Sequence, residues 1–397
     1  MSSEIKKVLF AHDGPLFYDP EGNYYGIHLT EKLKQRYRLL GNKVTFVIRT
    51  RPLPKDAGNH FSQILNNNFR VVDMPDYKSF TKYFSLRRKA KEIIEKLVIE
   101  HDIIIVRLPS GAGAIAVEYA KKHNKPLLAE MVACTWDAYW NYNWKGKLVA
   151  PYFYYRLKNR LKNLPYVIYV TRKFLQSRYP TNGFNTNISN VELSEIKEID
   201  LKKRLERIEG WDGQTPLTLL TIAALNVSYK GQDDVIKALY NLKKKGLLFK
   251  YRLIGQGSTD RLQNLINKLG LNNEVEIIGP VKHEDVFEEI AQTDIYIQPS
   301  KQEGLPRSVI EAMSKACPVI GANTGGIPEL ISPACIFKKG NKKQIAQLLS
   351  KIDKTFLSEM AKINFETAKE YLPELLSERR KEFYQTFINE NFQHDTK

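Results

Sequence analysis

The chain has 397 residues, with 61 lysines and arginines against 44 acidic residues, which gives a formal net charge of +17 at neutral pH. This length allows two or three domains with their own cores, and a hydrophobic content of 43% with 11% aromatic residues excludes a disordered chain. No apolar run approaches the roughly 18 to 20 residues that a membrane-spanning helix requires.

The N-terminal residues and the cysteines bear on the compartment. The N-terminal stretch Met1-Ser-Ser-Glu-Ile-Lys-Lys7 leads directly into a strand, so we expect no secretory signal. Cys134, Cys317 and Cys335 are odd in number and lack metal-type spacing. We therefore expect reduced, structural thiols in a cytoplasmic protein.

The first half of the chain alternates short β-branched strands with helical segments. This alternation is typical of a parallel sheet covered by helices. The predicted strands are residues 7–11, 44–48, 69–72, 103–106, 126–129 and 166–170. The connection formed by residues 13–26 is long for a loop between a strand and a helix, and long loops tend to mark function.

A second pattern in this half suggests a cofactor. Gly111 and Gly113, with Ala116, follow a predicted strand, and Glu130 ends the next one, so together they satisfy the dinucleotide fingerprint G-x-G-x-x-A with a later acid. An NAD-dependent oxidoreductase that uses Gly111-x-Gly113 is therefore one alternative function. However, the fingerprint normally follows the first strand of its domain, and small residues that pack a helix onto a sheet explain the same pattern better.

A net charge of +17 attracts phosphate-rich molecules, so it bears on the kind of partner that the protein binds. Basic and aromatic residues are mixed in segments 77–89 and 152–162, a composition that suits the headgroup boundary of a membrane. A solvated helix face with buried aromatic residues explains either segment equally well. A basic, non-enzymatic nucleic-acid-binding protein is a second alternative, suggested by charge alone.

The second half repeats the alternation of strands and helices. A polar stretch at about residues 181–214 contains turns and a charged helical piece, which we interpret as a linker. The strands predicted after it are residues 217–222, 251–254, 275–278, 295–297 and 318–321. We predict Rossmann-like domains at 1–190 and 191–365, and a C-terminal helix at 366–397.

Two carboxylates and a glycine pair mark the second domain. Glu303 and Glu311 flank the start of a predicted helix, and after a short strand Gly325 and Gly326 open another helix. Helix N-termini carry unpaired N–H groups and the positive end of the dipole, which suit a phosphate. Carboxylates accept hydrogen bonds from sugar hydroxyls. The combination predicts a pocket for a sugar joined to a diphosphate.

Other strand ends in this domain add to the pattern. Lys230 follows the first strand, where a single cation would stabilise a leaving diphosphate. Gly255 and Gly257 form another turn between a strand and a helix. The sequence contains no His-x3-His, Cys-x2-Cys or Asp-x-Asp pattern, so we expect no metal ion in the mechanism.

These motifs together resemble the retaining glycosyltransferases of family 4, the glycosyl transferases group 1, which have the GT-B fold. The close resemblance covers roughly residues 215–335. The matching stretches are Tyr229-Lys-Gly-Gln-Asp233, Pro299-Ser300, Glu303-Gly304-Leu305-Pro306, Glu311-Ala312-Met313 and Gly325-Gly326-Ile-Pro-Glu329.

The resemblance implies an α/β protein with two Rossmann-like domains facing a central cleft, and a terminal helix that crosses back to the first domain. It also implies that Glu303 faces the donor sugar, that Lys230 meets the leaving diphosphate and that Glu311 holds the ribose hydroxyls. The family's arginine near residues 221–225 is replaced by alanine here, and Arg307 is a candidate substitute. The remaining donor-binding residues implied are Gly304, Leu305, Gly255, Gly257, Gly325 and Gly326.

The function that the resemblance implies is a hexosyltransferase. It would move a sugar from a UDP- or GDP-type donor to a hydroxyl acceptor with retention, and it would need no cofactor. Many members build bacterial capsule, O-antigen or lipid-linked oligosaccharides. We therefore expect a saccharide or lipid-linked acceptor, no nucleic acid, and a cytoplasmic protein for which the inner face of the cell membrane is a candidate peripheral site.

Overall fold

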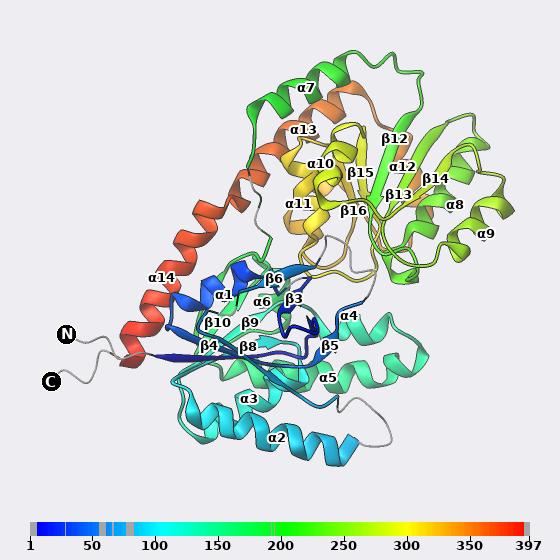
Figure 1. Cartoon of the computed structure of the whole chain (residues 1–397). Helices are drawn as coiled ribbons and strands as arrows, with labels where there is room; N and C mark the ends of the chain where they lie inside the picture. The colour runs from blue at the N-terminus through cyan, green and yellow to red at the C-terminus, as the bar shows by residue number, and fades with distance from the viewer. Residues whose placement is uncertain are drawn as a thin grey trace.

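The structure, a computed structural model, describes residues 6–392 except residues 28, 55–60, 66, 77–82, 192 and 194. Part of the basic segment predicted at 77–89 therefore lies outside the described residues. The chain forms two parallel sheets, each covered by helices on both faces, so the expected α/β architecture is confirmed (Figure 1).

The first sheet has seven parallel strands in the order β11-β10-β9-β8-β1-β4-β7. Every residue of the central strands β8 and β9 is buried, as expected for a parallel sheet with both faces covered. Six of these strands were predicted. The sequence did not predict β11, because Phe-Asn-Thr-Asn has little apolar content. The strands are β1 Lys7–Ala11, β4 Lys43–Ile48, β7 Phe69–Asp73, β8 Ile103–Leu108, β9 Leu127–Met131, β10 Tyr166–Tyr169 and β11 Phe184–Asn187.

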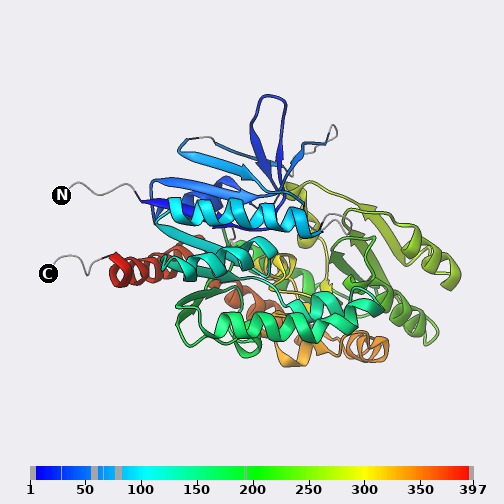
Figure 2. The same cartoon turned by 90° about the horizontal axis from the view of Figure 1, so that it is seen from below.

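Helices cover the two faces of this sheet from different parts of the chain. α2, α3 and α5 lie on one face of the sheet (Figure 2). Their apolar residues share one core cluster with the strands. α1 packs on the other face. The helices of this domain are α1 Glu31–Arg38, α2 Tyr83–Glu100, α3 Gly111–Lys122, α4 Thr135–Trp140, α5 Trp144–Lys162 and α6 Phe174–Arg178.

A small four-stranded sheet, in the order β5-β2-β3-β6, lies beside the first sheet. Its strands β2 and β3 form an antiparallel hairpin within residues 13–26, which the sequence analysis interpreted as a long loop. The interpretation as a loop was wrong because three-residue strands are too short to show an alternating pattern. The strands are β2 Leu16–Tyr18, β3 Tyr24–Gly26, β5 Thr50–Pro52 and β6 Ser62–Ile64.

The second sheet has six parallel strands in the order β14-β13-β12-β15-β16-β17. All except the two-residue β17 were predicted. The strands are β12 Leu217–Ile222, β13 Phe249–Ile254, β14 Val275–Gly279, β15 Ile295–Gln298, β16 Val319–Ala322 and β17 Ile336–Phe337. The α-helices are α7 Glu198–Glu209, α8 Gln232–Lys243, α9 Asp260–Leu269, α10 His283–Ala291, α11 Arg307–Ser314, α12 Lys342–Leu349 and α13 Lys354–Ala368, and the 3-10 turns are η2 Ser228–Lys230, η3 Ile327–Glu329, η4 Pro333–Cys335 and η5 Lys369–Tyr371.

The last helix, α14 (Pro373–Phe392), belongs to the core of the first domain. Its residues Leu376, Phe383 and Phe387 are buried with residues of β1, β4 and β8. The preceding α13 packs in the core of the second domain. Figure 1 shows α14 extending from one domain to the other. The domain limits given above remain predictions.

Candidate active site

Lys230 and Glu303 meet at the carboxyl end of the second sheet. Lys230 ends η2, and the next residue, Gly231, has a φ of 78°, where a Cβ would lie 2.1 Å from the Pro299 carbonyl oxygen. Glu303 lies in the loop between β15 and α11. The Lys230 Nζ is 2.7 Å from the Glu303 Oε1, and the two side chains are 20% and 10% exposed. The structure therefore brings together the two residues that were predicted to be catalytic.

Gln298 is a second partner of Glu303 that the sequence analysis missed. Its Nε2 donates to the Glu303 Oε1 at 3.0 Å, and its Oε1 accepts from the Tyr296 hydroxyl at 2.8 Å. Gln298 is the last residue of β15 and is 1% exposed. A polar residue at the end of an apolar strand was the available signal, since buried amides need hydrogen-bond partners.

Glu311 lies about one turn into α11 and is 5% exposed. The nearby Lys315, four residues further along the helix, has its Nζ 2.9 Å from the Asp200 Oδ2. Arg307, the first residue of α11, is exposed. Its proposed role as a second cation for the diphosphate remains a prediction.

The glycine pair touches the Glu303 loop directly. Gly325 has a φ of 59°, and a Cβ there would lie 2.5 Å from the Glu303 carbonyl oxygen. The Gly326 N–H donates to the Gly304 carbonyl at 2.6 Å. The helix predicted after this pair is only the single 3-10 turn η3, because the chain turns again toward β17. The Gly325-Gly326 pair and the Glu303 loop, which are separate in the sequence, thus pack together beside Lys230.

Gly255 and Gly257 follow β13 with φ values of 155° and 107°. A Cβ on Gly255 would lie 1.9 Å from the Ala223 carbonyl oxygen, and one on Gly257 would lie 2.6 Å from the Asn226 side chain. Both glycines therefore allow the turn after β13 to pack against the loop that leads to Lys230. Contact with a donor remains a prediction for both.

The Glu303 loop also reaches the first domain. Leu305 packs against the apolar cores of both domains. A Cβ on Gly304 would lie 2.6 Å from the Val132 carbonyl oxygen in the first domain. The Glu329 carboxylate accepts the backbone N–H groups of Arg172 and Phe174, each at 2.5 Å, at the start of α6. The predicted donor motifs thus form part of the contact between the domains.

The short helix α4 and its C-cap residue Asn141 supply further contacts that the sequence did not predict. The Asn141 Nδ2 donates to the Lys301 carbonyl at 3.1 Å, and the Asp137 Oδ1 lies 3.5 Å from the Lys339 Nζ. Asp137 is 3% exposed. α4 therefore lies directly against the segment that carries Glu303.

The dinucleotide fingerprint has a different role in the structure. The Gly111 and Ala112 N–H groups donate to the two carboxylate oxygens of Asp13 at 3.0 and 2.8 Å. A pyrophosphate would need these groups. Glu130 is 6% exposed and lies 2.7 Å from the Arg107 Nη2, so it is not available to a ribose. The NAD alternative is therefore wrong.

Three further findings concern the cysteines, metal-binding groups and the length and polarity of the helices. Cys134, Cys317 and Cys335 are buried, free thiols. Within the described ranges, no three His, Cys, Asp or Glu residues are grouped as a metal ion requires. In the same part of the chain, every helix is too short or too polar to cross a membrane.

Comparisons with known proteins identify the family. The model of the glycosyl transferases group 1 matches residues 204–363. Protein CapJ of Staphylococcus aureus is 30% identical over 361 residues, which cover 89% of this chain and 87% of CapJ. The chain belongs to the group 1 glycosyl transferases. The putative colanic acid biosynthesis glycosyltransferase WcaL of Escherichia coli is 30% identical over 159 residues, or 38% of this chain and 39% of WcaL.

Solved structures show that this group 1 glycosyltransferase has the GT-B fold. Sucrose-phosphate synthase from Thermosynechococcus elongatus superposes with a TM-score of 0.66 at 15% identity, covering 98% of this chain and 100% of that one. Anabaena Alr3699/HepE, solved in complex with UDP, gives a TM-score of 0.64 at 16% identity, covering 96% of this chain and 100% of that one. At these identities the similarity concerns the fold alone.

Proposed function

We propose that this glycosyltransferase moves a sugar from a nucleoside-diphosphate donor to a hydroxyl acceptor, with retention at the anomeric carbon. The contact between Lys230 and Glu303 is the observation that carries the proposal. It places one cation and one carboxylate at the carboxyl end of a parallel sheet, where such folds bind ligands. Structures of Anabaena Alr3699/HepE with UDP and with UDP-glucose support a donor of this class.

The chemistry assigns a separate task to each residue. The bond between the anomeric carbon and the diphosphate oxygen breaks, and the acceptor oxygen forms a new bond on the same face while its proton passes to the departing diphosphate. Lys230 would stabilise the charge that develops on that diphosphate. Glu303 would accept hydrogen bonds from sugar hydroxyls, and the buried Glu311 would accept them from the ribose.

The biological product that we propose is a bacterial surface polysaccharide or a lipid-linked oligosaccharide. Relatives named for the biosynthesis of colanic acid and of amylovoran support this proposal. We propose that the enzyme works in the cytoplasm, bound peripherally to the inner face of the cell membrane.

A panel of UDP- and GDP-sugars tests the proposal by thermal shift. A ligand at a hundred times its Kd stabilises the folded protein by about 2.7 kcal/mol, so one donor should raise the Tm clearly. Transfer from that donor, followed by NMR of the product, then reports the anomeric configuration. An inverted product would overturn retention, and no response to any nucleotide sugar would overturn the donor class.

A further inference from the structure

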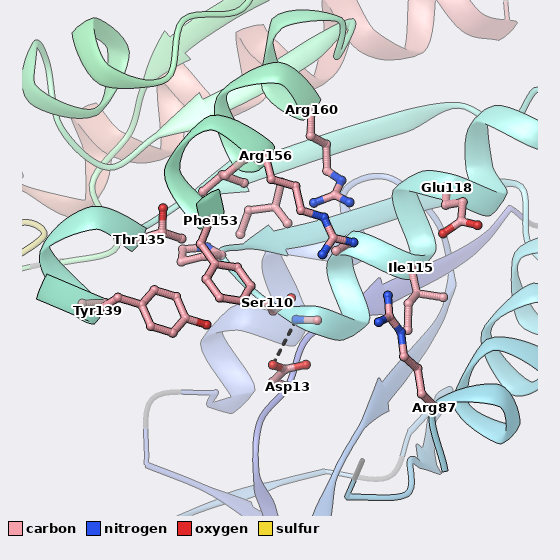
Figure 3. A pocket seen from close by; sticks show the side chains of 16 residues that line it. Asp13, Arg87, Ser110, Ile115, Glu118, Thr135, Tyr139, Phe153, Arg156 and Arg160 are labelled. Carbon is pink, nitrogen blue, oxygen red and sulfur yellow. Dashed lines mark hydrogen bonds between the residues drawn. The ribbon is translucent and has the colours of Figure 1, made fainter. Parts of the chain in front are cut away.

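A pocket in the first domain lies apart from the donor residues. It encloses about 400 Å³ at the carboxyl end of β8, between α2, α3 and α5. Three arginines line it, Arg87 from α2 and Arg156 and Arg160 from α5 (Figure 3). We call it the arginine pocket. From the sequence, these arginines belonged to two basic, aromatic segments that suit a membrane headgroup boundary or a solvated helix face, whereas in the structure all three line one cavity.

Two acidic residues, Asp13 and Glu118, also line the arginine pocket. Asp13 accepts two backbone N–H groups at the start of α3, and the Glu118 Oε1 lies 3.1 Å from the Lys91 Nζ. Burial and the charge of Arg156 lower the pKa of the Arg160 guanidinium, while the carboxylate of Glu118 acts in the opposite direction. The three arginines outnumber the two carboxylates in the lining, and a bound anion would relieve the repulsion between the guanidinium groups. Guanidinium groups match the geometry of phosphate oxygens.

The helix that carries two of these arginines also presents an exposed apolar face. Trp144, Leu148, Tyr152 and Tyr155 follow one side of α5 at helical spacing, and they are 68%, 72%, 62% and 59% exposed. We call them the α5 stripe. Contiguous apolar surface of this kind marks a binding site for a protein or a membrane.

Positive charge around the α5 stripe favours a membrane over a protein partner. The Lys145 Nζ lies 5.6 Å from the centre of the Trp144 ring, and the Lys147 Nζ lies 5.8 Å from that of Trp140. Tryptophan and tyrosine beside lysine suit the headgroup region, where the rings enter the acyl boundary and the amines meet lipid phosphates. The chain's net charge of +17 has the matching sign.

We propose that the arginine pocket binds the phosphate or diphosphate group of a lipid-linked acceptor while the α5 stripe rests in the bilayer surface. The proposal rests on the function proposed above and specifies its acceptor. α4 connects the two sites: Thr135 and Tyr139 line the arginine pocket, while Asn141 contacts the Lys301 carbonyl in the segment that carries Glu303. An acceptor sugar attached to the bound phosphate would extend past α4 toward Glu303.

Vesicle flotation tests the pocket with matched variants. The probe is phosphatidylcholine vesicles in which phosphatidic acid, a phosphate monoester, is the anionic lipid, compared with vesicles of equal charge made with phosphatidylglycerol, a diester. Arg156→Gln, Arg160→Gln and Arg87→Gln should each weaken binding to phosphatidic acid about tenfold or more, the effect of losing one charge-assisted hydrogen bond. Arg88→Gln and Lys162→Gln are the controls, because both residues are exposed and do not line the pocket.

The outcomes separate the possible sources of phosphate. The proposal is supported if the unmodified protein and the control variants prefer phosphatidic acid and the pocket variants lose this preference. Equal binding to both lipids, reduced alike by pocket and control variants, would show a general surface charge and overturn the pocket. If the protein binds inorganic pyrophosphate but no vesicles, the lipid source of the phosphate is overturned. If it binds neither pyrophosphate nor vesicles, the whole proposal is overturned.

A second variant tests the α5 stripe. Trp144→Gln with Leu148→Gln should lose vesicle binding and keep pyrophosphate binding, because both side chains are already exposed and contribute little to folding. Vesicle binding that survives this change would overturn the role of the stripe. The thermal shift with the preferred nucleotide sugar is measured in every variant. If the unmodified protein shows no thermal shift with any nucleotide sugar, the proposed function fails. If it shows the shift but does not bind vesicles, only the acceptor proposal fails.

Discussion

The two glutamates of the candidate site differ in their surroundings. Glu303 contacts Lys230 and Gln298 through one carboxylate oxygen, at the edge where the reacting sugar would lie. Glu311 is buried in the first turns of α11, where the helix dipole favours a negative charge. We therefore expect replacement of the two residues to affect different kinetic constants.

Glu303→Gln should lower kcat by on the order of a hundredfold, because the amide removes a charge that acts on the transition state and leaves Lys230 without its partner. Donor affinity should change little. Steady-state transfer assays, with donor binding measured by calorimetry, distinguish the two quantities. A fully active variant would exclude Glu303 from catalysis.

Glu311→Gln should instead weaken donor binding about tenfold, the effect of losing a charge-assisted hydrogen bond to the ribose. The kcat at saturating donor should stay close to that of the unmodified enzyme. Unchanged donor affinity and turnover would remove Glu311 from the donor site.

Glu130 forms a buried ion pair with Arg107 in the first domain. Burial alone would raise the pKa of the Glu130 carboxyl, but the adjacent Arg107 guanidinium holds it below its ordinary value of 4.5. Glu130→Gln leaves Arg107 buried without a counter-charge, so the free energy of unfolding at pH 7 should fall by about 3–5 kcal/mol. Urea unfolding measures this loss.

The pH dependence of the same variant gives an independent check. A carboxyl with a lowered pKa stabilises the folded state above its ordinary value, and this contribution is lost as the pH falls through the folded-state pKa. The difference in unfolding free energy between the unmodified protein and Glu130→Gln should therefore shrink below pH 4.5. A difference that stays constant with pH would contradict the pairing.

At the scale of elements, the contact between Glu329 and α6 joins the domains. Glu329→Ala leaves the N–H groups of Arg172 and Phe174 without their acceptor, so the free energy of unfolding should fall by about 1–3 kcal/mol. Glu370→Ala is the matched control, because its ion pair with Arg172 is partly exposed and should contribute under about 1 kcal/mol. Equal effects in urea unfolding would argue against a special role for Glu329.

The sequence predicted most of the sheet strands because their apolar runs are continuous. It failed where local patterns are weak: β2 and β3 are three residues long, and β11 has mostly polar residues. The carboxylate of Asp13 at the start of α3 could not be foreseen either, since it depends on packing between distant segments. For the fingerprint at Gly111, packing of the helix on the sheet was already the favoured explanation, but the contact with Asp13 was not part of it.

At the scale of the whole molecule, the family motifs predicted which residues gather at the site but not their contacts across the domains. Spacing placed Glu303 and Lys230 at strand ends, and parallel strands bring such ends together. Two contacts depend on how the domains are placed relative to each other. They are the packing of Leu305 in both cores and the hydrogen bond from Asn141 to the Lys301 carbonyl. Local patterns carry no information on that placement.

Transfer by the whole enzyme should continue in excess EDTA. Lys230 supplies a fixed positive charge for the diphosphate, and the sequence lacks the Asp-x-Asp pair that would hold a divalent ion. Initial rates with and without chelator should agree within error. Loss of activity that manganese or magnesium restores would show that a metal ion takes part.

The path of α14 has a consequence for how the protein folds during synthesis. Leu376, Phe383 and Phe387 fill the core of the first domain, yet they are made after the entire second domain. A ribosome therefore releases the second domain while the first still lacks one of its covering helices, and apolar residues of β1 and β4 stay accessible for that interval. Exposed apolar surface of this kind is prone to aggregation. Chain termination before α14 should thus be more damaging than loss of an equally long surface helix.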